Sequence, residues 1–124
     1  MAAKGPKRRP EQVAESIRAV LAEALVQGEV RDPRVGMVTV SHVEVTRDMS
    51  VATVRVAPHA DSEEAKEEAI AGLQSAAGYL RRMVAATLTS RTVPELRFVR
   101  DRGLEHAQRI DELLEGIRRG EDPS

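Results

Sequence analysis

The chain has 124 residues, of which 41% are hydrophobic and 31% charged, and its formal net charge is -1. This length supports one hydrophobic core with short tails and is too small for two domains. The absence of cysteine excludes disulfide bonds and thiolate metal sites. With one tyrosine and one phenylalanine, the core has to be aliphatic, and the chain lacks the aromatic platform on which many single-strand binders stack bases.

The first ten residues form a basic arm. Lysine and arginine occur there among glycine and proline, a composition that predicts a flexible segment over residues 1–10. No apolar stretch follows these residues and no long apolar run occurs elsewhere, so we expect a soluble cytoplasmic protein without a signal peptide or membrane span. From Glu11 to about Gln27 apolar residues recur at helical spacing, and Gly28 is a stop signal for this helix.

A β-hairpin is predicted next. The segment VRDPRVG, residues 30–36, is rich in turn residues and leads into the strand MVTVSHVEVT. The valines of this strand change phase near Ser41 and His42, which predicts a β-bulge or a strong twist there. After the turn RDMS, residues 51–57 alternate again until Pro58 ends the strand, so the two strands should form an antiparallel hairpin.

The second half of the chain is predicted to hold two helices, a strand and a last helix. Asp61 followed by Glu64 resembles a capping box at the start of a helix. The apolar stripe of this helix continues in register past Gly78, which indicates a kink or two consecutive helices that share one face. The segment PELRFVR predicts a third short strand, and residues 103–119 predict an amphipathic helix before a tail at residues 120–124.

This order of elements favours an α+β fold with the helices packed on one face of a three-stranded sheet. The apolar stripes should converge in a single core, for which we predict Ile17, Leu21, Val40, Val54, Leu73, Leu80 and Phe98.

Charged residues are segregated along the chain. Residues 78–102 contain six arginines and two acids and residues 1–18 are also basic, whereas residues 61–68 and 103–124 are acidic. Such blocks indicate a polyanionic partner such as a nucleic acid. The acids of residues 61–68 are explained as a solvated helix start, where negative charge is favourable.

Gly78 stands inside the predicted helical stripe, where glycine costs roughly 1 kcal/mol relative to alanine. It would let the chain bend and let a phosphate approach the start of the next helix, whose free N–H groups favour anions. Arg81 and Arg82 follow one turn later and would reach the same phosphate with forked donors. Alternatively, Gly78 only relieves crowding between helices, and the two arginines form a solvated face.

Two further features have two interpretations each. The run RDPR, residues 31–34, is either a turn or a phosphate site formed by Arg31 and Arg34. Tyr79 is either a side chain on which a base stacks or a half-buried tyrosine with its hydroxyl in water.

The other polar residues do not form a recognisable catalytic or metal site. Three histidines lie on different predicted elements without the spacing of metal ligands, namely His42, His59 and His106. Ser41, His42 and Asp48 are the residue types of a catalytic triad, but neighbours in a strand face opposite sides of the sheet. We therefore expect no catalytic residues, no metal and no other cofactor.

Three stretches together resemble the ribosome-binding factor A family, whose members are bacterial assembly factors of the small ribosomal subunit. They are DPRVGMVTVSHVEVTRDMSVATVRV, residues 32–56; LQSAAGYLRR, residues 73–82; and RTVPELRFVRD, residues 91–101. The resemblance covers about residues 11–115. It implies a KH domain of type II topology over residues 11–102, in the order helix-strand-strand-helix-helix-strand, with the C-terminal helix added.

The resemblance also implies where RNA binds. In ordinary KH domains a GxxG loop lets the nucleic-acid backbone approach closely. In this family an interhelical Ala-x-Gly kink replaces the loop; it is matched here by Ala76, Ala77 and Gly78, with Ser75 where the first glycine of GxxG would fall. Together with the basic residues of the arm, the connector, the hairpin turn and the block after the kink, the predicted RNA-binding residues are Lys7, Arg8, Arg9, Arg31, Arg34, Arg47, Ser75, Ala76, Gly78, Arg81, Arg82 and Arg91.

The function that the resemblance implies is non-enzymatic. Such a protein would bind the immature small (30S) subunit, promote late maturation and 5′-end processing of its 16S rRNA, and support growth in the cold. It would act as a cytoplasmic monomer without a cofactor and leave when a maturation GTPase remodels the particle. The alternative is a protein-interaction module whose acidic blocks and C-terminal helix engage a basic partner such as a ribosomal protein.

Overall fold

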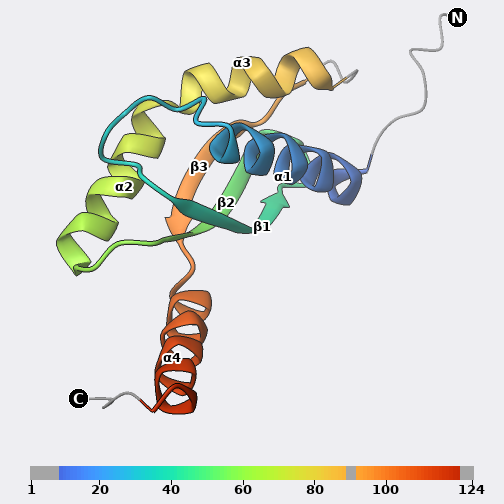
Figure 1. Ribbon diagram of the computed structural model, residues 1–124. Coiled ribbons are helices and arrows are strands. Elements are labelled where there is room, and N and C mark those ends of the chain that lie inside the picture. The colour runs from blue at the N-terminus through green and yellow to red at the C-terminus, as the bar shows by residue number, and fades with distance from the viewer. Residues whose placement is uncertain (1–8, 89–91, 121–124) are drawn as a thin grey trace, which may run out of the picture.

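The computed structural model describes residues 9–88 and 92–120, and within them the chain folds into helices on a sheet (Figure 1). The element order confirms the predicted α+β fold with type II KH topology and one added helix. The elements are α1 (Pro10–Val26), β1 (Val38–Val45), β2 (Val51–Pro58), α2 (Glu63–Ser75), α3 (Ala77–Thr87), β3 (Glu95–Arg100) and α4 (Arg102–Arg118).

α1 begins one residue earlier than the sequence pattern suggested. Pro10 is its first residue, a position that suits proline because its missing N–H would have no helical partner there. The backbone N–H of Arg9 donates to Oε1 of Gln12 at 3.1 Å. Arg9 therefore belongs to the helix start and not to the predicted flexible arm, whose residues 1–8 lie outside the described part of the chain.

The sheet has the order β1-β2-β3. β1 and β2 form the predicted antiparallel hairpin, and β3 runs parallel to β2. The register shifts between Val40 and His42, which confirms the predicted β-bulge and leaves Ser41 as its extra residue. The Ser41 hydroxyl donates to Oδ2 of Asp101 at 2.6 Å and has the carbonyl oxygen of Arg55, at 3.2 Å, as an alternative acceptor. The bulge thus directs a side chain of β1 to the start of α4.

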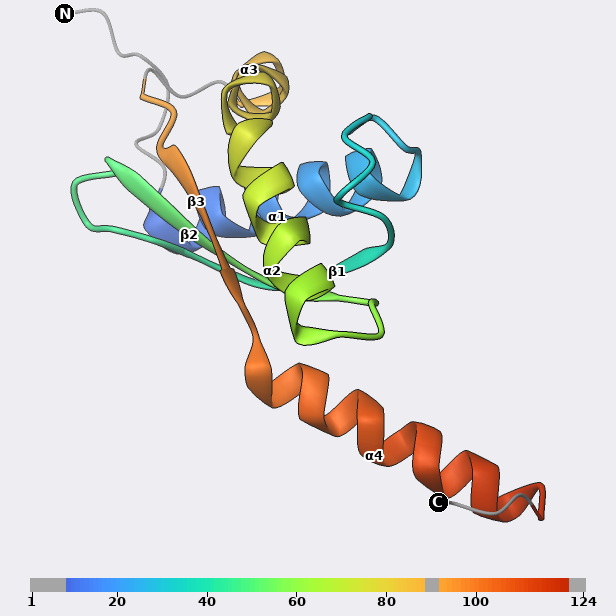
Figure 2. The same ribbon diagram turned by 90° about the vertical axis from the view of Figure 1, so that its left-hand side faces the viewer.

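α1, α2 and α3 cover one face of the sheet, as Figure 2 shows. Alternate residues of β2 and β3, such as Val54 and Phe98, point into this layer and are buried. All seven predicted core residues are buried in it, which confirms the single aliphatic core. Each such side chain contributes roughly 1.5–3 kcal/mol by leaving water.

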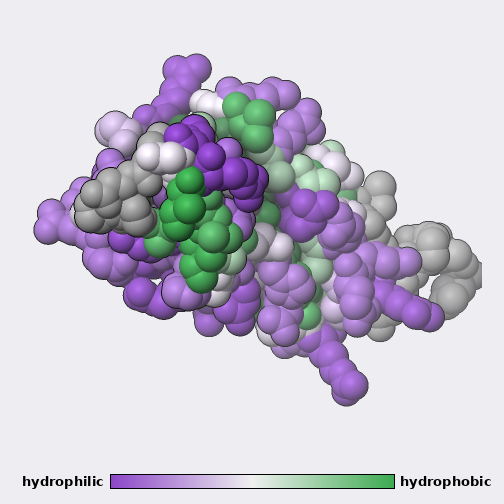
Figure 3. Space-filling view, turned by 60° about the horizontal axis from the view of Figure 1, so that its bottom comes forward, coloured by the Kyte–Doolittle hydropathy of each residue, from purple (hydrophilic) through white to green (hydrophobic). Residues whose placement is uncertain are grey.

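α4 does not join this layer, contrary to the expectation that the helices pack on the sheet. Figures 1 and 2 show it projecting from the end of β3, and none of its residues is buried. Its apolar side chains are exposed and gather on the helix near the C-terminus (Figure 3); they are Ile110, Leu113, Leu114 and Ile117. Of the helices described, none has the length and apolar character needed to cross a membrane.

Ser62, and not the predicted Asp61, caps α2. Its Oγ accepts from the backbone N–H of Ala65 at 3.0 Å, which satisfies one of the free donors of the first turn. Serine and aspartate are equally good caps, so the choice between these two neighbours depends on how the incoming chain is placed.

The kink between α2 and α3 lies at Ala76, and this corrects the role expected for Gly78. Ala76 is the C-cap of α2 and the N-cap of α3, with φ -88° and ψ 1°, in the bridge region that L-residues occupy at turns. Gly78 is a helical residue of α3 outside the left-handed region, and a Cβ on it would meet no atom closer than 3.8 Å. Gly78 is therefore not required for the bend.

Candidate nucleic-acid interface

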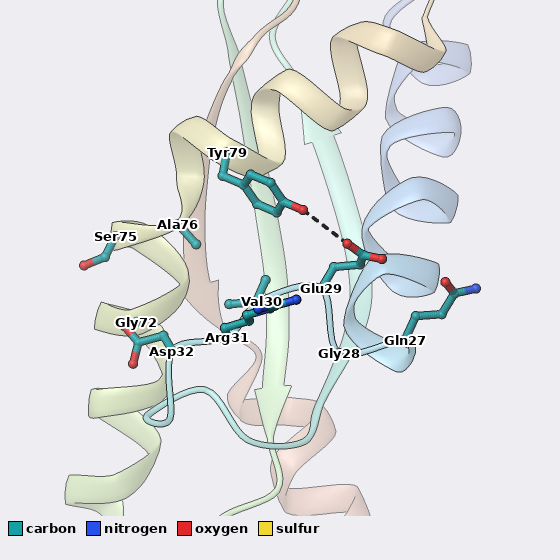
Figure 4. A pocket seen from close by; sticks show the side chains of 10 residues that line it. All are labelled: Gln27, Gly28, Glu29, Val30, Arg31, Asp32, Gly72, Ser75, Ala76 and Tyr79. Carbon is teal, nitrogen blue, oxygen red and sulfur yellow. Dashed lines mark hydrogen bonds between the residues drawn. The ribbon is translucent and has the colours of Figure 1, made fainter.

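The loop after α1 packs against the junction of α2 and α3 and leaves a cavity of about 570 Å³ (Figure 4). This volume is in the range of ligand pockets, roughly 300–1,000 Å³. The cavity brings the predicted connector and the predicted kink together, although they are distant in sequence. We name it the kink pocket; it is lined by Gln27, Gly28, Glu29, Val30, Arg31, Asp32, Gly72, Ser75, Ala76 and Tyr79.

Two glycines allow the loop to approach α2. Gly28 ends α1 with a φ of 70°, a left-handed conformation that favours glycine. Gly72 lies where the loop crosses α2, and a Cβ on it would stand 2.9 Å from Cγ2 of Val35. The close approach of this loop therefore requires glycine at position 72, and the walls of the kink pocket depend on it.

The RDPR run forms a turn. The backbone N–H of Arg34 donates to Oδ1 of Asp32 at 2.9 Å, and the N–H of Val35 donates to the Asp32 carbonyl at 3.1 Å. The Arg34 guanidinium donates to the same carboxylate, with Nη2 2.7 Å from Oδ2, and thereby lowers the pKa of Asp32 from 3.8 to about 2. Nη2 of Arg34 also donates to Oγ of Ser75 at 3.3 Å. Arg34 and Ser75 are thus neighbours, but Asp32 already balances the charge of Arg34.

The two arginines after the kink have different surroundings, contrary to the expectation that both reach one phosphate. Arg81 donates from Nε and Nη2 to the carbonyl oxygen of Val93, at 3.2 and 2.7 Å. It therefore ties α3 to the segment before β3. Arg82 is exposed and has no hydrogen bond or ion pair with the described residues. Consecutive helical residues point about 100° apart, which explains why one exposed arginine reaches the segment before β3 and the other does not.

Tyr79 bridges the mouth of the kink pocket. The residue is 42% exposed, and its hydroxyl donates to Oε2 of Glu29 at 3.1 Å (Figure 4). This hydrogen bond raises the pKa of Tyr79 above its ordinary value of 10.0, while the positive charges of Arg31 and Arg82 act in the opposite direction. The partly exposed ring agrees with both sequence interpretations, but the hydroxyl has a protein partner. Arg31, Arg82, Glu29 and Tyr79 therefore form one neighbourhood.

The remaining predicted RNA-binding residues lie elsewhere or outside the described residues. Arg47 is in the β1–β2 turn, which Figures 1 and 2 place at the opposite end of the sheet from the loop after α1. Arg9 begins α1, whose first turn borders the end of β1 and not the kink pocket. Lys7, Arg8 and Arg91 lie outside the described residues.

The arginine block of residues 78–102 is not one basic surface, which corrects the inference drawn from its charge. The Arg100 side chain is 5% exposed and is bound by the carboxylates of Glu63, Glu67 and Glu105. Arg102 pairs with the first two of these. We name these five residues the α4 anchor. Glu63 and Glu67 are thus ion-pair partners of β3 and α4, and not only a solvated helix start as predicted.

The polar residues that resembled a triad are separated by the fold. Ser41 is bound to Asp101 at the base of α4, whereas Oδ1 of Asp48 accepts from the hydroxyls of Thr46 and Ser50 inside the hairpin turn. Across residues 9–88 and 92–120, no group of three histidine or acidic side chains is placed to hold a metal ion.

Sequence reasoning missed Glu29 and Gly72. Gly72 carried the same signal as Gly78, a glycine inside a helical stripe, and would have identified the crossing of the loop. Glu29 carried no comparable signal, because a single acid after a helix stop is common on protein surfaces.

Comparison with known proteins identifies the family. A family model described as "Ribosome-binding factor A" matches residues 9–114. The ribosome-binding factor A of Thermomicrobium roseum is 44% identical over 112 residues, which are 90% of this chain and 85% of that protein.

A crystal structure and a fitted homology model of the Thermus thermophilus protein are similar in fold. The crystal structure of its ribosome-binding factor A has a TM-score of 0.61 and 27% identity, covering 75% of this chain and 97% of that chain. A homology model of the same protein, fitted into the cryo-EM map of a 30S complex, has a TM-score of 0.58 and 28% identity over 72% of this chain and 91% of that one. With its KH-like fold, its kink and these relatives, the chain belongs to the ribosome-binding factor A family.

Proposed function

We propose that the chain binds the small ribosomal subunit through the face that holds the kink pocket, with Arg31 and Arg82 as phosphate contacts. The observation that carries this proposal is that both guanidinium groups are exposed beside the kink and make no hydrogen bond or ion pair within the described residues. Arg34 and Arg81, by contrast, are occupied by Asp32 and by the carbonyl of Val93. A free guanidinium can bind phosphate without breaking an existing contact.

The shape of the kink supports the same face. The residues at the helix junction are small. Ala76 carries only a methyl group, and Gly78, which is exposed, carries no side chain. A nucleic-acid backbone can therefore approach the helix junction closely, as it does at the glycine loop of other KH domains. The 30S complex of the Thermus thermophilus protein supports the small subunit as the partner.

In this proposal the protein acts without catalysis. It binds one conformation of the immature 16S rRNA better than others and so shifts the folding particle toward it. The family resemblance supports a role in late maturation and 5′-end processing of that RNA, in growth in the cold, and in release by a maturation GTPase in the cytoplasm.

Co-sedimentation with small subunits tests the interface. Arg82→Glu should weaken binding at least about tenfold, because like charge would face phosphate, and leave thermal unfolding unchanged. Arg109→Glu, on an exposed site of α4, makes the same charge change and serves as the matched control, with wild-type binding expected. Wild-type affinity of Arg82→Glu at physiological salt would contradict the proposed interface. Arg81 is left intact because replacing it would also break its bond to Val93.

Maturation in cells tests the role. A strain whose only copy carries Arg82→Glu should accumulate 16S rRNA with an unprocessed 5′ end, more strongly in the cold. Normal 5′ ends in that strain would contradict this part of the proposal, even if binding in vitro is weakened.

The basic arm is proposed to add affinity without specificity. Removing residues 1–8 should weaken binding and reduce its dependence on salt, because fewer counterions are released from the RNA. An unchanged salt dependence would exclude the arm from the interface.

One observation favours the alternative of a protein-interaction module: the apolar side chains of α4 are exposed. If α4 were the binding surface, Ile110→Ser combined with Ile117→Ser would abolish association with small subunits, whereas Arg82→Glu would be harmless. We expect the opposite pattern.

A further inference from the structure

The kink pocket has features that phosphate binding does not use. An aromatic ring, Tyr79, stands on one side, and small or apolar groups lie beside it, namely Val30, Ala76 and the backbone of Gly72 (Figure 4). Flat apolar surfaces beside a ring are typical of sites where an unstacked base is held. The volume of about 570 Å³ leaves room for a nucleobase.

The pocket also presents one available carboxylate. Two acids line it, but the carboxylate of Asp32 is held by the guanidinium of Arg34. The carboxylate of Glu29 accepts only from the Tyr79 hydroxyl among the described residues, through Oε2. A carboxylate offers about four lone-pair sites, so most of its accepting capacity remains.

This chemistry selects one base. Guanine is the only common RNA base whose Watson–Crick edge carries two adjacent N–H donors, N1–H and the N2 amino group, which match the two oxygens of a carboxylate. Adenine and cytosine offer one amino donor beside a ring acceptor, and uracil offers one imino donor between two carbonyls. A carboxylate therefore faces an acceptor on each of those three bases and two donors on guanine.

We propose that the kink pocket takes an unpaired guanine base of RNA, stacked on Tyr79 and recognised by Glu29. This inference rests on the proposed function, because the RNA backbone is brought to the pocket by Arg31 and Arg82. Their positive charges lie beside the same ring and offset the repulsion between Glu29 and the phosphates. Glu29 thus determines specificity, whereas the two arginines supply affinity.

The chain has an intrinsic fluorescent probe for binding of a base in the kink pocket. Tyr79 is its only tyrosine and it has no tryptophan, so tyrosine emission reports on the kink pocket alone. We would titrate the full chain with the pentaribonucleotides UUGUU, UUAUU, UUCUU and UUIUU, where I is inosine. UUGUU should quench the emission and bind about tenfold or more tightly than UUAUU and UUCUU. UUIUU, which lacks the N2 amino group, should fall between.

Two variants assign the recognition to its residues. Glu29→Gln should remove most of the preference for UUGUU, because an amide offers one acceptor and one mismatched donor. Glu64→Gln makes the same charge change on an exposed residue outside the pocket and should keep the preference. Tyr79→Ala should weaken all four oligonucleotides by calorimetry, whereas Tyr79→Phe should retain most of the affinity, because the ring remains.

Equal affinity for the four oligonucleotides, or binding without a change in tyrosine emission, would overturn the inference. So would a guanine preference that survives Glu29→Gln. These failures differ from failure of the proposed function: loss of subunit binding in Arg82→Glu together with no guanine preference would retain the interface and exclude only the base site.

Discussion

Arginines from one stretch of sequence lie beside the kink pocket and in the α4 anchor, but their surroundings are opposite. Beside the kink pocket, Arg82 is exposed and has no partner among the described residues. In the α4 anchor, Arg100 is almost fully buried and binds three carboxylates. The two regions carry the same residue type in one basic block, yet only one of them offers positive charge to a partner.

This difference teaches that the charge of a segment is not the charge available on its surface. Two of the carboxylates that neutralise Arg100 come from α2, 33 and 37 residues away in the sequence, and the third comes from α4, five residues further on. A buried arginine with three acceptors links elements of the fold. Its acidic partners neutralise its positive charge, so this charge is not available to a polyanion. The two regions should therefore differ in their contribution to stability as clearly as they differ in structure.

The largest expected effect separates Arg100 from Arg82. Arg100→Ala should lower the free energy of unfolding by about 3 kcal/mol, because the mostly buried carboxylate of Glu105 loses its main partner and keeps only Lys66, at 3.7 Å. Arg82→Ala should change it by less than about 0.5 kcal/mol. Urea unfolding followed by circular dichroism measures both. Equal losses in the two variants would remove the distinction between the regions.

The next effect concerns the glycine under the loop. Gly72→Ala should cost roughly 1–3 kcal/mol, because its Cβ would stand 2.9 Å from Cγ2 of Val35 and the loop would have to move. Since the same loop lines the kink pocket, binding to small subunits should also weaken. Wild-type thermal stability in this variant would show that the loop moves aside without loss of stability.

A smaller effect of opposite sign is expected at the other helical glycine. Gly78→Ala should stabilise the protein by roughly 0.5–1 kcal/mol, because alanine favours the helix and the new methyl group would meet Nη1 of Arg82 at an ordinary contact distance of 3.8 Å. A destabilised variant would restore the original expectation that Gly78 is needed for the kink.

The smallest effect is on protonation. Hydrogen bonding from Arg100 lowers the pKa of Glu63 from 4.5 to about 2, so the folded state binds this proton more weakly than the unfolded state. The stabilisation is present above pH 4.5 and is lost as the pH falls toward 2. In NMR titrations, Arg100→Ala should raise the pKa of Glu63 toward 4.5, because its largest hydrogen-bond contribution is lost, whereas Arg34→Ala should raise only the pKa of Asp32, on the kink side, toward 3.8. A change in the pKa of both carboxylates in either variant would indicate that the two regions are coupled.

Local periodicity was sufficient for the order of the elements and for the core. The alternation of valines in β1 and β2 predicted both strands and the bulge at Ser41, because side chains alternate along a strand whatever it pairs with. The helical stripes predicted Ile17, Leu21 and Leu80 as buried for the same reason. These features depend on which residues avoid water, and that pattern can be read from each short stretch of sequence.

The partners of polar groups, by contrast, were decided by the tertiary structure. Nothing near Arg81 in sequence indicates the carbonyl of Val93, and nothing near Arg100 indicates Glu63. Likewise, the glycine signal pointed to position 78, whereas the required one is Gly72, where a loop from another part of the chain crosses the helix. A hydrogen bond, an ion pair or a steric limit depends on which distant residues come within a few ångströms, and only the packed fold determines that.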